Sequence, residues 1–256
     1  MAFVILERND GISHIKLDRA ERYNALNKDM LSELRNIVKQ VEKNEDQVVL
    51  LSGNGNAFCA GGDISMMKNF ENKEFYDSVM KSIEEIVLTL YKMPKVVISA
   101  IQGSAVGLGL SLALTADYVV AQREANVGML FIGVGLAPDG GGHFWLSERI
   151  GIHKAKQFTW GMRQVEGPEA KAMGLVDQLT TESAVDEATK MAKQMLTMPI
   201  KAIIKTKQIY HHKKADDLKE YLEEERKAQW ELRNTHDHQE GVRAFLEKRN
   251  PMFKGK

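Results

Sequence analysis

One stretch of the sequence restricts the possible folds more than any other. Residues Val96 to Ala116 carry no charge over 21 positions, a length that could cross a membrane as a helix. Serines, Gln102 and three glycines interrupt the stretch, and Lys95 and Asp117 flank it without an aromatic belt. A buried strand, a glycine turn and a buried helix explain it better, so we expect a chain without membrane spans.

Strands and helices alternate on both sides of this stretch. Two alternating runs, residues 3–8 and 12–17, are joined by Asp10-Gly11, which predicts a hairpin. The other predicted elements are strands at 48–52, 96–101 and 118–121, and helices from the N-cap Asn27, at 72–92 and at 107–115. Successive strand-turn-helix units of this kind predict an α/β fold, largely parallel, with helices packed outside the sheet.

Beyond about residue 183 the sequence predicts helices alone. They cover Ser183 to Leu196, Ile200 to His212, Leu218 to His236 and Gln239 to Arg249. Pro199 marks a boundary, so we divide the chain into a core, residues 1–196, and a C-terminal helical region, residues 197–256. Residues 248–256 hold four bases and no acid, which favours a frayed, solvated tail, with a contact to a phosphate-bearing ligand as the alternative.

The composition excludes several classes of partner and site. With 35 basic and 35 acidic residues, the chain lacks the positive surface that binds nucleic acid or anionic membranes. Its single cysteine, Cys59, fits a reducing cytoplasm, and the apolar neighbours of this thiol predict core packing rather than a nucleophile. Histidines 211, 212, 236 and 238 lack zinc-binding spacing, so we expect them at the surface and expect no metal site.

Two glycine-containing segments precede predicted helices. They are Ala57-Phe-Cys-Ala-Gly-Gly-Asp-Ile64 and Gln102-Gly-Ser-Ala-Val-Gly-Leu-Gly-Leu-Ser111, and neither has the glycine spacing of a nucleotide-binding loop. Each can leave unpaired backbone N–H groups at a helix start, and two such groups aimed at one oxygen form an oxyanion hole. Ordinary turns before helices contain the same residues, so spacing alone leaves both interpretations open.

A third segment, Ala137-Pro-Asp-Gly-Gly-Gly142, contains a carboxylate. An aspartate after proline is a common helix N-cap, and the residue pattern alone favours that role for Asp139. A general base is the alternative. In that role Asp139 would lie in a largely apolar pocket, because Leu130 and Phe131 stand in the segment just before it. Desolvation in such a pocket would raise the pKa of Asp139.

The strings AFCAGGDI, GSAVGLGLSLALTADYVVA and GLAPDGGG, in this order, resemble the motifs of the crotonase superfamily, the enoyl-CoA hydratase/isomerase fold. The resemblance extends from LDRAERYNALN near the start to FLEKRNPMFK near the end. It implies a spiral of strand-strand-helix (ββα) units followed by a helical region that forms a homotrimer or a dimer of trimers. It also implies a cytoplasmic enzyme acting on an acyl-CoA thioester, with coenzyme A as part of the substrate and no separate cofactor.

The resemblance also implies positions for the site residues. It gives the oxyanion hole to the backbone N–H groups of Ala60 and Leu108, although Leu108 stands where the family usually has glycine. Beside the adenine and pantetheine arm of coenzyme A it puts Gly61, Gly62, Asp63 and Ile64. It puts Lys248 beside the phosphates of coenzyme A.

The positions of the family's glutamates distinguish the possible activities. Family hydratases carry two, at the positions of Ser111 and Phe131 here, and neither residue can replace a carboxylate in water addition. We expect both residues to contact substrate. Family isomerases resemble this chain in placing their acid in the turn that holds Asp139, and one carboxylate suffices to move a proton along a dienolate. We therefore expect an enoyl-CoA isomerase that shifts a 3-enoyl double bond to position 2. The alternatives are a hydratase or another acyl-CoA lyase or hydrolase, and an inactive acyl-CoA binder.

Overall fold

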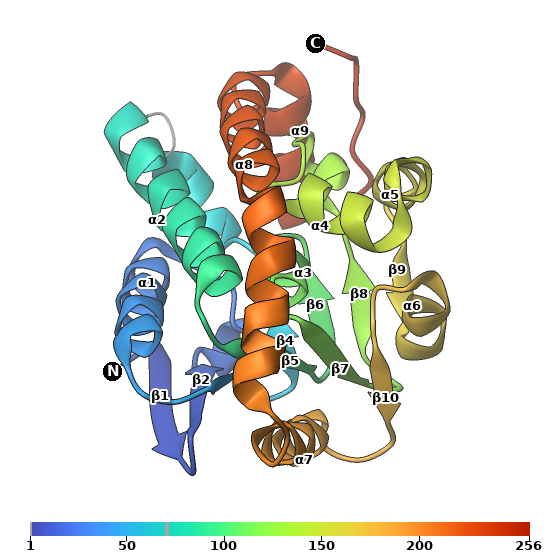
Figure 1. Ribbon diagram of the computed structural model, residues 1–256. Helices are drawn as coiled ribbons and strands as arrows, with labels where there is room; N and C mark the ends of the chain where they lie inside the picture. Colours follow the sequence, from blue (N-terminus) through green and yellow to red (C-terminus); the bar gives the residue numbers. More distant parts are fainter. Residues whose placement is uncertain (1, 70–71) are drawn as a thin grey trace.

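The computed structural model describes residues 2–69 and 72–256, and two β-sheets organise them (Figure 1). The larger sheet has the strand order β1-β2-β3-β5-β7-β10 and the smaller one the order β4-β6-β8-β9. The strands of the larger sheet are β1 (Val4–Asn9), β2 (Ile12–Leu17), β3 (Val48–Gly53), β5 (Val96–Ile101), β7 (Tyr118–Gln122) and β10 (Gln178–Thr180). Those of the smaller sheet are β4 (Ala57–Cys59), β6 (Ser104–Val106), β8 (Asn126–Gly128) and β9 (Gln164–Glu166).

Each central strand of the larger sheet continues into the smaller sheet and then into a helix. The chain passes from β3 to β4, from β5 to β6 and from β7 to β8, and these strands pair in parallel within their sheets. The helices that follow are α2 (Lys73–Lys92), α3 (Leu108–Leu114) and α4 (Gly142–Ile150). Where β5 turns into β6, a Cβ on Gly103 would lie 1.9 Å from the Asn56 carbonyl oxygen, so only glycine fits. The ββα spiral implied by the resemblance is confirmed.

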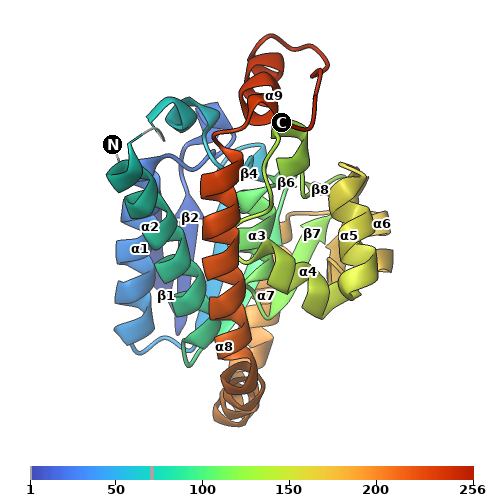
Figure 2. The same cartoon turned by 90° about the horizontal axis from the view of Figure 1, so that it is seen from above.

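The larger sheet is covered on both faces, which explains why β3 and β5 are almost continuously apolar. Val49 and Leu51 point to one face, toward α1 (Lys28–Lys43) and α2. Val48 and Leu50 point to the other, toward α7 (Ala184–Leu196) and the first turns of α8 (Ile200–Leu232). Figure 2 shows α1, α2 and α8 lying side by side.

Several local predictions are confirmed. Strands β1 and β2 form an antiparallel hairpin, and Asp10 and Gly11 both have positive φ, as a tight hairpin turn requires. Asn27 caps α1, its side-chain oxygen accepting from Met30 N at 2.8 Å. Cys59 is completely buried, and desolvation raises its pKa to about 12. In the described part of the chain, no helix combines the length and apolar character needed to cross a membrane.

The predicted break between His212 and Leu218 is wrong, because α8 is one helix of 33 residues. The residues between the two predicted helices include four charged side chains and no glycine or proline. Ala215 and Leu218 are buried, so the charges belong to the outer face of a continuous helix. Helices α5 (Ile152–Trp160), α6 (Gly167–Met173) and α9 (His236–Leu246) complete the fold.

Two expectations about the surface are also corrected, the second for His211 and His238 alone, since His212 and His236 are exposed as predicted. The C-terminal tail is bound rather than frayed: Glu240 accepts from Met252 N at 2.9 Å, and Asp237 accepts from the backbone of residues 254 and 255. His238 is buried, with Nδ1 2.7 Å from the Val134 oxygen, and His211 stacks on Tyr91 at 3.9 Å. Each imidazole supplies both an apolar ring and a polar nitrogen, so it packs where sequence spacing suggested only a polar surface.

Candidate active site

A cavity of about 280 Å³ lies where the loops after β4, β6 and β8 meet the C-terminal helices. Its walls include Ala60, Gly62, Ile64, Phe131, Asp139 and Phe245. Among the described residues that line it, Asp139 alone is titratable, and most of the others are apolar. A single carboxylate therefore lies beside a largely apolar space.

The carboxyl group of Asp139 is buried and poorly satisfied. Its Oδ1 atom has no hydrogen-bond partner among the described residues, and its Oδ2 atom has a long contact of 3.4 Å with Gln229 Nε2. Burial, followed by the negative charge of nearby Glu225, raises the pKa of Asp139 well above its ordinary value. The predicted direction of this shift is confirmed.

The competing prediction, that Asp139 caps a helix, is wrong. Helix α4 has Gly141 as its N-cap residue, and no side chain from the cap position bonds to it. Glu225 of α8 takes this role instead, accepting from Gly141 N at 2.7 Å and from His143 N at 3.0 Å. The Asp139 side chain is therefore left free of a capping function.

The two residues at the positions of the family's glutamates differ in placement. Phe131 lines the cavity, and its contact with substrate stays a prediction. Ser111 is fully buried, and its hydroxyl donates to the backbone oxygen of Asp139 at 2.7 Å. The predicted contact between Ser111 and substrate is thus contradicted, because this side chain is buried on the protein side of the Asp139 turn and is bonded to its backbone.

The first expected oxyanion donor is also corrected. The N–H of Ala60 donates to the Tyr23 oxygen at 2.9 Å, so it is already used, although Ala60 still lines the cavity. Gly62 lies two residues after Ala60, and both of its neighbours bond to Leu26. The Leu26 N–H donates to the Gly61 oxygen, and the Leu26 oxygen accepts from Asp63 N. The N–H of Gly62 therefore points away from Leu26, and it has no acceptor within the described part of the chain.

The second expected donor fits its predicted role. Leu108 is the first residue of α3, so its N–H has no acceptor inside the helix. The two loops approach closely at Gly61, where φ is +96° and a Cβ would lie 2.8 Å from the Val106 oxygen and 3.6 Å from Leu108 N. The unused N–H groups of Gly62 and Leu108 therefore belong to adjacent segments beside the same cavity.

The remaining residues predicted to contact the ligand lie on the wall of the 280 Å³ cavity or outside it. Ile64 lines the cavity, whereas the Asp63 carboxylate is held by Arg19 at 2.6 Å and by Ser65 N at 2.9 Å. Lys248 follows α9 with an exposed side chain, three residues after Phe245 of the cavity wall. The contacts of Gly61, Gly62, Asp63, Ile64 and Lys248 with coenzyme A stay predictions.

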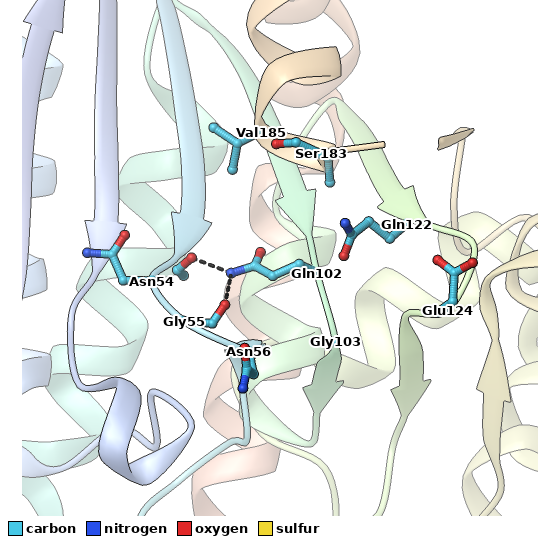
Figure 3. A pocket seen from close by; sticks show the side chains of 11 residues that line it. Asn54, Gly55, Asn56, Gln102, Gly103, Gln122, Glu124, Ser183 and Val185 are labelled. Carbon is cyan, nitrogen blue, oxygen red and sulfur yellow. Dashed lines mark hydrogen bonds between the residues drawn. The ribbon is translucent and has the colours of Figure 1, made fainter. Parts of the chain in front are cut away.

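A larger cavity, of about 550 Å³, lies where the two sheets join and shares no lining residue with the first. Figure 3 shows Gln102 directed at the neighbouring loop, where its Nε2 donates to the carbonyl oxygens of Gly53 and Gly55. Among the described residues that line this larger cavity, Glu124 alone is titratable. Since Gln102 serves to hold the loop there, we assign the chemistry to the smaller cavity.

The chain is similar to known proteins over nearly its whole length. The sequence profile of the enoyl-CoA hydratase/isomerase family matches residues 7–256. YhaR of Bacillus subtilis (strain 168), provisionally named an enoyl-CoA hydratase/isomerase, is 45% identical over 253 residues, 99% of each chain. The 1,2-epoxyphenylacetyl-CoA isomerase of Escherichia coli (strain K12) is 34% identical over 261 residues, the whole of each chain.

A solved structure gives the same result for the fold. The crystal structure of an enoyl-CoA hydratase from Mycobacterium avium subsp. paratuberculosis K-10 superposes with a TM-score of 0.90 at 27% identity, covering 99% of both chains. The profile match and the relatives each span nearly the whole chain. The chain therefore belongs to the enoyl-CoA hydratase/isomerase family, the crotonase superfamily.

Proposed function

We propose that this protein is an enoyl-CoA isomerase that converts a 3-enoyl-CoA to the 2-enoyl isomer, with Asp139 as the base. The observation that carries the proposal is the unpartnered Oδ1 of Asp139 beside the apolar cavity. A buried carboxyl with a raised pKa holds a removed proton well enough to return it, instead of losing it to water.

The proposed reaction uses two backbone donors and one carboxylate. The N–H groups of Gly62 and Leu108 receive the thioester oxygen, and ionised Asp139 removes a proton from C2 of the acyl chain. The electrons of that C–H bond form a dienolate across C1 to C4, whose negative oxygen the two N–H groups stabilise. The Asp139 carboxylic acid then protonates C4, leaving a double bond between C2 and C3 and restoring the carboxylate.

Water addition is less well supported by the same cavity. A hydratase needs one group to activate water and another to protonate carbon. Asp139 is the single titratable side chain among the described lining residues, and the buried Ser111 hydroxyl is bonded to a backbone oxygen. The proton shift that one carboxylate can perform therefore takes precedence. Coenzyme A enters as part of the substrate, and the proposed chemistry needs no further cofactor.

An ultraviolet assay with 3-hexenoyl-CoA and, separately, crotonyl-CoA tests the proposal. We expect isomerisation of the first and no hydration of the second. Asp139→Asn keeps the side-chain size, so we expect kcat to fall by at least about 10²-fold while substrate binding is retained. Hydration of crotonyl-CoA without isomerisation would replace the proposed activity, and binding without any turnover would indicate an inactive acyl-CoA binder.

A further inference from the structure

Two side chains of α8, four residues apart in the helix, form hydrogen bonds with the loop that carries Asp139. They are Glu225 and Gln229, both buried, and they contact residues 137–143 from 82 to 92 positions further along the chain. Because residues i and i+4 lie on one face of a helix, α8 presents the pair together. We refer to Glu225 and Gln229 as the α8 clamp.

Glu225 holds the C-terminal side of the turn. Its carboxylate accepts from two backbone N–H groups, those of Gly141 and His143, and lies 2.8 Å from the Nδ1 atom of His143. These bonds place a negative charge at the N-terminus of α4, where the helix dipole favours it. The Glu225 side chain is only 2% exposed, so water screens its charge poorly.

Gln229 holds the N-terminal side. Its Nε2 donates to the Ala137 oxygen at 2.6 Å, and the same nitrogen is 3.4 Å from Asp139 Oδ2. An N–H dipole near a carboxylate stabilises its charged form, whereas a neighbouring carboxylate destabilises it. The two members of the clamp therefore act on Asp139 in opposite directions.

Few other charges face Asp139. On α2 the phenol of Tyr76 lies close enough to feel its charge, and that hydroxyl donates to the Arg226 backbone oxygen at 2.5 Å. The guanidinium of Arg233 lies over the rings of Trp230 and Tyr76, at 4.4 and 5.7 Å from their centres. His143 contacts Glu225, with its Nδ1 atom 2.8 Å from the carboxylate. Glu225 is thus the negative group that acts on Asp139 directly.

We propose that the α8 clamp is a pair of opposing positioning residues for Asp139: Glu225 favours the protonated carboxyl and Gln229 favours the carboxylate. The helix thereby adjusts, in addition to the larger effect of burial, the pH at which the base becomes ionised, and it fixes the backbone on both sides of that base. That this ionisation of Asp139 serves isomerisation rests on the proposed function. The effect of the α8 clamp on the ionisation of Asp139 is itself a property of the folded chain.

Carboxyl ¹³C NMR titration of aspartate-labelled protein tests the clamp without turnover, with the Asp139 signal assigned by its absence in Asp139→Asn. In Glu225→Gln, which removes the charge and keeps the size, we expect the Asp139 midpoint to fall by about one pH unit or more. In Gln229→Met, which removes the donor and adds no charge, we expect it to rise. Glu224→Gln is the matched control, because Glu224 is exposed and pairs with Lys227 on the outer face of α8.

The outcomes separate the clamp from a purely structural role. Opposite shifts in the two clamp variants, with no shift in the control, support the proposal. An unmoved Asp139 midpoint in both would overturn it, even if both variants were less stable or slower. If Glu225→Gln does not fold, the rise in Gln229→Met decides alone. Where turnover is present, the acid limb of kcat/KM should follow each NMR midpoint. A protein that shifts as expected but does not isomerise would refute the proposed function and leave the clamp supported.

Discussion

At the scale of single residues, the identity of the backbone donors depends on a change of direction at Gly61. In a regular strand, residues 60 and 62 would direct their N–H groups to the same edge. The left-handed φ of Gly61 breaks that regularity, so Ala60 bonds to Tyr23 while the Gly62 N–H is left unused. The sequence identified the loop correctly but could not show which amide was free, because the partner lies almost 40 residues earlier.

Leu108 offers a test of the backbone donors. It is the first residue of α3, a position where proline is well tolerated, so Leu108→Pro removes the N–H with little damage to the helix. We expect kcat to fall by about 10²- to 10³-fold relative to Leu108→Ala, which loses the same packing but keeps the N–H. Equal activity of the two variants, measured with 3-hexenoyl-CoA, would show that this amide does not bind the oxyanion.

At the scale of elements, the sequence predicted what is locally encoded. The hairpin, the Asn27 cap and the strands β3, β5 and β7 depend on turn residues, on one capping side chain and on apolar runs, all of which are visible in sequence. The clamp on α8 depends on contacts with Asp139 and α4, more than 80 residues away in the chain. No local pattern encodes such contacts, so sequence analysis missed Glu225 and Gln229.

Two buried residues of α8, Lys207 and Glu225, bond to the rest of the protein, and the number of residues between them permits another test. Near its start, Lys207 Nζ lies 2.7 Å from Asp117 Oδ2, and Glu225 follows 18 residues later, which is five full turns at 3.6 residues per turn. One alanine inserted between Lys213 and Lys214 would rotate Glu225 by about 100° relative to Lys207. We expect at least about a 10²-fold loss of kcat, whereas Lys213→Ala should be active. Full activity of the insertion variant would show that the helix absorbs the extra residue as a bulge.

At the scale of the whole molecule, Asp139 should lower the free energy of unfolding at the pH values at which it is ionised for the reaction. Its pKa is raised in the folded state, so above the unfolded carboxyl's pKa of about 3.9 the unfolded chain loses its proton first. The free energy of unfolding then falls by about 1.4 kcal/mol for each pH unit until the folded pKa is passed. We expect Asp139→Asn to be more stable than the wild type at pH 7, with an advantage that shrinks toward pH 4. Urea unfolding at both pH values measures the difference in free energy of unfolding between this variant and the wild type. Asp216→Asn, at an exposed position, serves as control. An equal gain in the free energy of unfolding at pH 4 and pH 7 would contradict this explanation.

The ββα spiral distributes the working groups one to each successive turn. The loop after β4 supplies Gly62, the segment after β6 supplies Leu108, and the loop after β8 leads to Asp139. The first two contribute only main chain, whose position is tied to the pairing of β4 with β6 and tolerates almost any side chain. The third contributes a side chain, on a loop that Ser111 and the α8 clamp hold in place. A scaffold divided in this way would separate the main-chain groups that hold a thioester from the side chain that acts on it.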